Sequence, residues 1–223
     1  MQAVLFDVDG TLIDTVDFHA ESWVRAFRHF GIETRFDEVR HQIGKGSDLL
    51  MPVFVPEDVL EKQGKAMEEF RADLFLREYV PRIRPFPGVR ALFERCRAAG
   101  LKVVLASSGK EDEVERYKKI AGIADLIEDQ TSSSEVERSK PYPDIFQAAV
   151  AKCSPVTAEQ AIAVGDTPYD VEASGRAGIR CIGVLCGGFP EAELREAGAV
   201  AIYRDPADLL VRFDTSPLNS GPA

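Results

Sequence analysis

The chain has 223 residues, of which 45% are hydrophobic and 29% are charged, and its formal net charge is −10. This length allows one large domain, or a core domain with a smaller one, and it can bury a full hydrophobic core. The negative charge argues against nucleic acid as a partner, and the absence of any run of about 18 apolar residues argues against a membrane span.

The first predicted element is a strand at residues 3–6, an apolar run that ends at the turn Asp7-Val8-Asp9-Gly10-Thr11. Such a run is typical of a parallel strand that is covered on both faces. Residues 16–84 then have a helical pattern, with a stop at Gly31 and a second helix over 58–79. Prolines at 81, 85 and 87 end this helical segment.

From residue 87 onward, helices and short strands alternate, which predicts a parallel sheet with helices on both faces. A helix is expected over 89–99, and strands are expected at 101–106, 125–128, 161–164, 181–185 and 200–203. The predicted fold is therefore α/β, with a Rossmann-like parallel core formed by residues 1–15 and 85–215. An α-helical cap domain at 16–84 is inserted into it, with hinges near 14–16 and 81–86. The remaining residues, 216–223, are rich in Ser, Pro and Gly, so we expect a disordered tail.

Four groups of polar residues lie at the ends of predicted strands or in a turn. They are Asp7 with Asp9, Ser107-Ser108-Gly109, Lys140 before Pro141, and Asp166 with Asp170. Each one alone is a common turn or helix cap. Because the carboxyl ends of parallel strands meet at one edge of a sheet, the four together predict a single site.

The carboxylates indicate phosphoryl chemistry. Asp7 can attack phosphorus and form an aspartyl-phosphate, while Asp9 can protonate the leaving oxygen and then activate water. Crowded carboxylates next to a phosphate need a cation. Mg²⁺ prefers oxygen ligands, so Asp7 and Asp166 are candidate metal ligands.

The other groups would bind and orient the phosphate. The Ser107 hydroxyl and the N–H groups of Ser108 and Gly109 can hold phosphate oxygens at a helix N-terminus. Lys140 adds a fixed positive charge against the nucleophile and the phosphoryl group. Asp170 can orient Lys140 or a metal-bound water.

These motifs resemble the four motifs of the haloacid dehalogenase superfamily: DVDGT at 7–11, Ser107, Lys140-Pro141, and GDTPYD at 165–170. The helical insertion is similar to the small cap of the beta-phosphoglucomutase and phosphoglycolate phosphatase branch. Within that branch, Asp14-Thr15, His19 and Trp23 resemble the first cap helix of beta-phosphoglucomutase-like proteins.

The resemblance implies that Asp7 is the nucleophile and Asp9 the acid/base. It also implies that Asp7, the main-chain carbonyl of Asp9, and Asp166 hold Mg²⁺. Dehalogenase members lack the second aspartate of the first motif, so the presence of Asp9 favours phosphoryl transfer.

The cap is expected to select the substrate. Gly44-Lys45-Gly46-Ser47 lies where such caps present a substrate loop, and His19 is a second candidate contact. The alternatives are a solvated turn for Lys45 and a packed or capping histidine for His19. Trp23, Phe27 and Phe30 fit better as the hydrophobic core of the cap itself.

The predicted function is a Mg²⁺-dependent phosphatase acting on a small phosphorylated metabolite, such as a sugar phosphate or a phosphoglycolate-like compound. The alternatives are a phosphomutase of the beta-phosphoglucomutase type, a phosphonate hydrolase using a cap lysine, and a non-enzymatic binding module. The form of the motif at 165–170 favours the phosphatase. The expected partner is the metabolite, with no nucleic acid or membrane, and the chain would be a monomer or homodimer. Four cysteines without CxxC or zinc spacing, and the lack of a signal-peptide pattern, predict a cytoplasmic protein.

Overall fold

The computed structural model describes residues 1–132 and 135–219. Within these residues, all strands belong to one parallel sheet with the order β3-β2-β1-β4-β5-β6. The strands are β1 (Ala3–Phe6), β2 (Lys102–Ala106), β3 (Asp129–Thr131), β4 (Ala161–Gly165), β5 (Arg180–Val184) and β6 (Ala201–Tyr203). The predicted Rossmann-like α/β core is confirmed.

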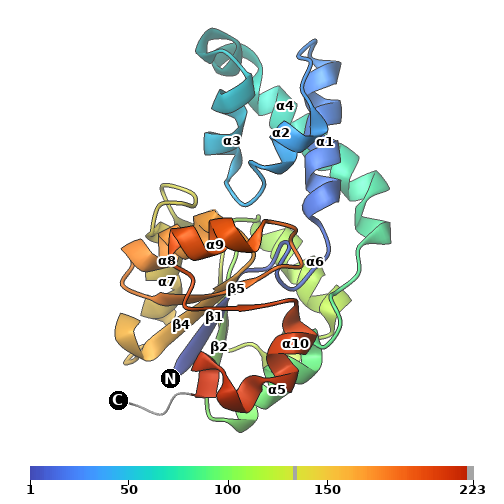
Figure 1. Ribbon diagram of the computed structural model, residues 1–223. Helices are drawn as coiled ribbons and strands as arrows, with labels where there is room; N and C mark the ends of the chain where they lie inside the picture. The colour runs from blue at the N-terminus through green and yellow to red at the C-terminus, as the bar shows by residue number, and fades with distance from the viewer. Residues whose placement is uncertain (133–134, 220–223) are drawn as a thin grey trace.

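Helices cover both faces of the sheet, as Figure 1 shows. Alternate side chains of β1 enter opposite hydrophobic layers: Val4 and Phe6 pack on one side, Ala3 and Leu5 on the other. The first layer includes residues of α5 (Val89–Ala98), α6 (Glu111–Ala121) and α10 (Pro206–Val211). The second includes residues of α7 (Asp144–Lys152), α8 (Pro168–Arg176) and α9 (Glu191–Ala197). This period-2 burial fixes the register of the strands, and hence which residues end up at the carboxyl edge.

The helical segment at 16–84, called the cap below, stands over the carboxyl edge of the sheet, at the end of the molecule opposite the N-terminus (Figure 1). Its helices are α1 (Val16–His29), α2 (Phe36–Arg40), α3 (Ser47–Phe54) and α4 (Glu57–Glu78). They bury a hydrophobic cluster of their own, in which Trp23 and Phe27 stack at 5.4 Å and Phe30 packs at the edge. The division into core and cap domains at 15/16 and 84/85 stays a prediction.

Two expectations about local structure are wrong. The strand expected at 125–128 is displaced: Ala124–Leu126 form a 3₁₀ turn, and the strand begins only at Asp129. The apolar side chain of Leu126 packs into the core from that turn, which mimics a buried strand in the sequence. The tail is ordered over Pro217–Asn219, a 3₁₀ turn whose Leu218 side chain is buried in the core. Residues 220–223 of the predicted tail lie outside the described residues.

None of the helices described at 1–132 and 135–219 has the length and apolar character that crossing a bilayer requires.

Candidate active site

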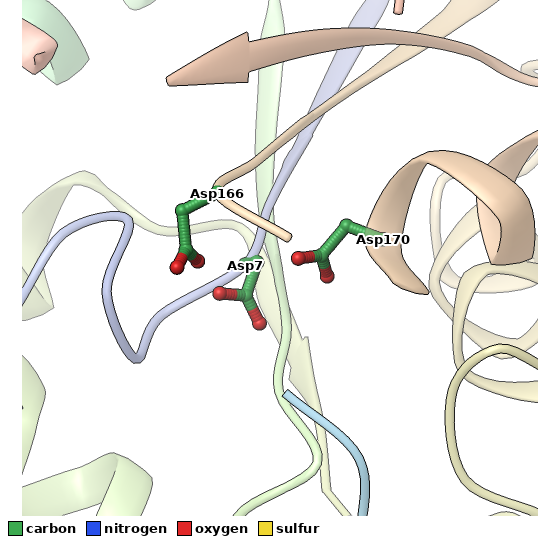
Figure 2. Close-up of side chains that lie close together, drawn as sticks. All are labelled: Asp7, Asp166 and Asp170. Carbon is green, nitrogen blue, oxygen red and sulfur yellow. The ribbon is translucent and has the colours of Figure 1, made fainter. Parts of the chain in front are cut away.

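Three aspartates meet at the carboxyl edge of the sheet. Asp7 directly follows β1, Asp166 directly follows the neighbouring strand β4, and Asp170 lies in the first turn of α8. Figure 2 shows their carboxylates pointing toward one another, and one oxygen from each lies within 4.8 Å of the others. The parallel topology therefore brings together side chains that are far apart in the sequence, as expected.

Lys140 lies between two of these aspartates. Its Nζ is 2.6 Å from Asp7 Oδ1 and 2.7 Å from Asp170 Oδ1, and the residue is only 2% exposed. Burial by itself lowers the pKa of Lys140, but the charges and hydrogen bonds of Asp170 and Asp7 outweigh it and raise the pKa. The lysine is thus held as a buried cation next to Asp7.

The carboxyl groups of Asp7 and Asp166 would repel each other if both were ionised. Burial raises the pKa of Asp7 to about 7, against the opposing effect of Lys140. Burial, together with the charges of Asp7 and Asp170, raises the pKa of Asp166 well above its usual value. Asp166 Oδ2 is buried and has no hydrogen-bond partner. The Thr11 hydroxyl lies 3.0 Å from Asp7 Oδ2 and 2.9 Å from Asp166 Oδ1, but its single proton can serve only one of them.

This donor set fits a hard divalent cation such as Mg²⁺, which takes carboxylate oxygens as ligands. Asp7 and Asp166 have oxygens available for it. The Asp170 oxygens are already used, because Oδ1 accepts from Lys140 and Oδ2 accepts from the N–H and the hydroxyl of Thr167. Asp170 is therefore better suited to orienting Lys140 than to direct metal binding.

Asp9 is engaged by the start of the cap and not by the cluster of the other three aspartates. Its Oδ1 accepts from the Thr15 hydroxyl at 2.7 Å and lies 2.8 Å from Nε2 of His19. Burial raises the pKa of Asp9, but His19 and Thr15 outweigh it and lower the pKa. No hydrogen bond to Asp9 Oδ2 occurs among the described residues, so this oxygen is free to face a substrate. Any metal contact from Asp9 would come from its main-chain carbonyl, as the resemblance implies.

His19 is a cap residue in direct contact with Asp9. The residue is 7% exposed, and its ring stacks on Phe75 at a centroid distance of 4.3 Å. Nδ1 contacts the Arg71 guanidinium, and Nε2 contacts Asp9 and the Tyr117 hydroxyl. The sequence reasoning missed Arg71 and Tyr117. Tyr117 occupies a buried position of the amphipathic helix α6, where the sequence pattern predicts only a residue of the hydrophobic core. Arg71 belongs to no motif.

The serine turn after β2 adjoins the aspartates. Ser107 is 1% exposed, and its Oγ accepts a hydrogen bond from the Gly109 N–H at 3.0 Å. The Gly109 N–H is therefore engaged within the turn, contrary to the expectation that it binds phosphate. Ser108 lines the cavity described next, and its buried Oγ has no hydrogen-bond partner. These serines stay candidates for phosphate binding.

A cavity of about 540 Å³ lies between the cap and the carboxyl edge of the sheet. Its lining includes Asp7, Asp9 and Lys140 from the core and Trp23 and Lys45 from the cap. This volume falls within the range of small-molecule sites.

Lys45 is partly engaged within the protein. Its Nζ donates to Gln42 Oε1 at 2.6 Å and lies 4.7 Å from the centre of the Tyr169 ring, and burial lowers its pKa. Gly44 brings this loop close to the core, because a Cβ there would lie 2.7 Å from Thr167 Cγ2. Lys45 thus faces the cavity at the junction of cap and core.

Comparisons with known proteins agree with this geometry. A phosphorylated carbohydrates phosphatase from Thermotoga maritima is 29% identical over 216 residues, covering 94% of this chain and 97% of that protein. The chloroplastic protein SUPPRESSOR OF QUENCHING 1 from Arabidopsis thaliana is 32% identical over 218 residues, but this chain spans only 20% of its length. The crystal structure of a hydrolase from Pseudomonas syringae is similar with a TM-score of 0.89 and 29% identity, covering 96% of this chain and 99% of that one.

The sequence model of the haloacid dehalogenase-like hydrolases matches residues 4–184, a range that contains all the aspartates of the site, Ser107 and Lys140. With the parallel sheet and the site at its carboxyl edge, this match shows that the chain belongs to the haloacid dehalogenase-like hydrolase family.

Proposed function

We propose that this chain is a Mg²⁺-dependent phosphatase that hydrolyses a monoester of a small phosphorylated metabolite through an aspartyl-phosphate on Asp7. The observation that carries the proposal is the position of Asp7. Its Oδ1 accepts a 2.6 Å hydrogen bond from the buried cation Lys140, and Asp7 lines the cavity between cap and core. The name of the Thermotoga maritima relative supports a phosphorylated carbohydrate or similar metabolite as the substrate. The unpaired cysteines agree with a cytoplasmic location.

In the first step, an oxygen of Asp7 attacks phosphorus and the bond from phosphorus to the leaving oxygen breaks. Asp9 is ionised in the free protein, so it first takes up a proton on Oδ2 as the negatively charged phosphoryl group binds beside it. It then gives this proton to the leaving oxygen, and the alcohol departs. In the second step, Asp9 takes a proton from water as the water attacks the phosphoryl group on Asp7. The bond from phosphorus to Asp7 breaks, which releases phosphate and restores both aspartates.

The surrounding residues hold charge and orientation. Lys140 and Ser107 would bind the phosphoryl oxygens, and Asp170 holds Lys140 at 2.7 Å. Asp7 and Asp166, with the main-chain carbonyl of Asp9, would hold Mg²⁺. The bound ion would neutralise carboxylate and phosphoryl charge. The cap, with hinges near 14–16 and 81–86, would exclude water from the aspartyl-phosphate and contact the leaving group through His19 and Lys45.

The direct test measures phosphate release from a panel of sugar phosphates, phosphoglycolate and p-nitrophenyl phosphate, with Mg²⁺ or with EDTA. Asp7→Asn should abolish the Mg²⁺-dependent release, and beryllofluoride should add to the wild-type Asp7 carboxylate as a phosphoryl mimic. Asp58→Asn, on the exposed start of α4, is the matched control and should keep full activity. Normal turnover by Asp7→Asn would refute the mechanism.

A phosphomutase is the second candidate, because the contact of His19 with Asp9 at 2.8 Å closes one side of the site with a cap residue. A mutase needs this protection, since its aspartyl-phosphate must reach a second sugar hydroxyl before water. The two functions differ in stoichiometry. A phosphatase releases one phosphate for each sugar phosphate consumed, whereas a mutase converts hexose 1-phosphate to 6-phosphate with little release.

A further inference from the structure

Tyr117 brings a buried hydroxyl from the core to the cap. The residue lies on α6 and is 1% exposed. Its hydroxyl donates to Glu113 Oε1 at 3.1 Å, one helical turn earlier, and lies 3.4 Å from Nε2 of His19 on α1. None of the family motifs noted above includes this position.

The contacts of His19 define the orientation of its ring. Two residues of α4 contact it: the Phe75 ring stacks on the face of the imidazole, and the Arg71 guanidinium contacts Nδ1. A guanidinium can only donate, so Nδ1 accepts and Nε2 carries the ring proton. That N–H faces two groups of the core, Asp9 Oδ1 at 2.8 Å and the Tyr117 hydroxyl at 3.4 Å.

The Tyr117 hydroxyl presents its oxygen lone pairs to His19, because its own proton is given to Glu113. The shorter contact, to Asp9, is therefore the main acceptor of the Nε2 proton, and Tyr117 is a weaker second acceptor beside it. A ring with two acceptors at one edge has less freedom to rotate away from either, and both groups are buried, where hydrogen bonds are stronger than in water.

We propose that Tyr117 is a positioning residue for Asp9, acting through His19. When the cap is seated, the Tyr117 hydroxyl and Glu113 hold the Nε2 edge of His19, and His19 in turn keeps Asp9 Oδ1 fixed. Asp9 Oδ2 is then aimed at the leaving oxygen. This inference rests on the proposed function, since it assigns Tyr117 to the proton transfer from Asp9.

The hydroxyl is not needed for packing. Tyr117 shares its buried helix face with Val114 and Ala121, and it belongs to the first of the two hydrophobic layers described above. Tyr117→Phe keeps the ring and removes only the hydroxyl. Tyr203→Phe is the matched control, because Tyr203 is also a buried tyrosine, at 6% exposure, but lies on the edge strand β6.

The first readout is the dependence of kcat/KM on the leaving group. This constant reports cleavage of the first phosphorus–oxygen bond and not the later hydrolysis of the aspartyl-phosphate. An alkoxide needs the proton of Asp9 to leave, whereas p-nitrophenolate departs without it. Tyr117→Phe should lower kcat/KM about tenfold for an alkyl ester such as a hexose 6-phosphate, the effect of losing one buried hydrogen bond. It should change kcat/KM for p-nitrophenyl phosphate less than about twofold. Tyr203→Phe should change neither.

The second readout needs neither metal nor turnover. The chain has three histidines, so ¹⁵N-histidine NMR of the metal-free protein resolves each ring. Tyr117→Phe should move the Nε2 resonance of His19 and leave His29 and His41 unchanged. Equal losses on both esters, or an unmoved His19 resonance, would overturn the role of Tyr117. Failure of the wild type to hydrolyse either ester would instead refute the proposed phosphatase, and the inference with it.

Discussion

Ser139 Oγ donates a 2.7 Å hydrogen bond to Asp48 Oδ1, which joins the first turn of the cap helix α3 to the residue that precedes Lys140. The Ser139 N–H also lies 3.5 Å from Asp48 Oδ2. The approach is close, since a Cβ on Gly46 would lie 2.7 Å from Ser139 Cβ. A seated cap is therefore linked directly to the loop that carries the buried cation of the site.

Asp48→Ala should weaken this seating without touching the reacting groups. The contact is exposed to solvent, so we expect only a two- to fivefold rise in KM for a preferred metabolite, the effect of one hydrogen bond. A small ester such as p-nitrophenyl phosphate relies less on the cap and should show a smaller change. Steady-state kinetics on both esters checks this, with Asp58→Ala as an exposed control on the same cap. Identical constants for Asp48→Ala and wild type would show that the contact does not contribute to closure.

Lys140→Ala should lower kcat by roughly 10²- to 10³-fold, the usual effect of removing one fixed stabilising charge. Lys140 forms buried ion pairs with Asp7 and Asp170. Because its removal leaves these carboxyl groups without a partner, the variant should also unfold at a lower temperature in the absence of Mg²⁺. Lys152→Ala is the control, because Lys152 is an ion-paired lysine of the core, 2.7 Å from Glu135, outside the site. A loss of less than about tenfold in Lys140→Ala would mean that this lysine is not essential to the chemistry.

The metal-free protein should lose stability as the pH rises from about 4 to 7. The pKa of Asp7 in the folded protein is raised to about 7, above its usual value of 3.8. The folded state therefore holds a proton that the unfolded chain releases earlier. The stabilisation from this proton is complete below the unfolded pKa and is lost as the pH passes through the folded pKa. Thermal melts in EDTA at pH 5 and pH 8 should show the lower midpoint at pH 8.

Mg²⁺ should reduce this pH dependence, because it binds only the folded site and takes the place of the proton. Asp7→Asn has no carboxyl group to titrate there, so its melting temperature in EDTA should vary less with pH than that of the wild type. A wild-type midpoint in EDTA that does not fall between pH 5 and pH 8 would contradict the raised pKa of Asp7.

Asp166→Asn should separate stability from activity. The carboxyl group of Asp166 is fully buried next to Asp7 and has one unpartnered oxygen, and these surroundings raise its pKa. At alkaline pH, where the wild-type group must ionise in the metal-free protein, the Asn variant carries no charge and avoids this repulsion. We expect a higher melting temperature than wild type in EDTA at that pH, a smaller gain on adding Mg²⁺, and loss of phosphatase activity. A variant that melts lower than wild type in EDTA would show that Asp166 stabilises the fold through its contact with Thr11 rather than straining it.

The sequence was sufficient for the sheet and for the convergence of Asp7, Lys140, Asp166 and Asp170, because these features depend on local patterns. A buried strand is an apolar run, and a residue after such a strand lies at the carboxyl edge whatever the rest of the chain does. The prediction for the edge strand β3 is wrong for the same reason. Its buried neighbour Leu126 belongs to a turn. The strand itself has only three residues, which pair with β2 alone, so its sequence is too short to show an apolar pattern.

The contacts between cap and core could not be predicted in this way. Tyr117 contacts His19 across 98 residues of sequence, and Ser139 contacts Asp48 across 91. In the sequence, Tyr117 fits a core position of a helix and Ser139 fits a solvated turn. Such pairs depend on how the cap is oriented on the sheet, which no local period encodes. The contact of Asp9 with His19 depends on the same orientation of the cap.

Lys45 tests whether the cap selects the substrate. Its Nζ lies at the cavity, bonded to Gln42 and placed over the Tyr169 ring, so it can reach the part of a substrate that is not phosphate. Lys45→Ala should raise KM severalfold for the preferred metabolite and change the ranking among metabolites. Turnover of p-nitrophenyl phosphate, which lacks those groups, should stay nearly unchanged. KM and kcat should be measured on the preferred metabolite and on p-nitrophenyl phosphate, with Lys65→Ala, at an exposed lysine of α4, as the control.

Equal losses on the two esters would mean that Lys45 serves the chemical step, as a mutase or a phosphonate hydrolase with a cap lysine requires. No loss on either would make it a residue of a solvated turn, and substrate selection would then fall to His19 and the other cap side chains that line the cavity.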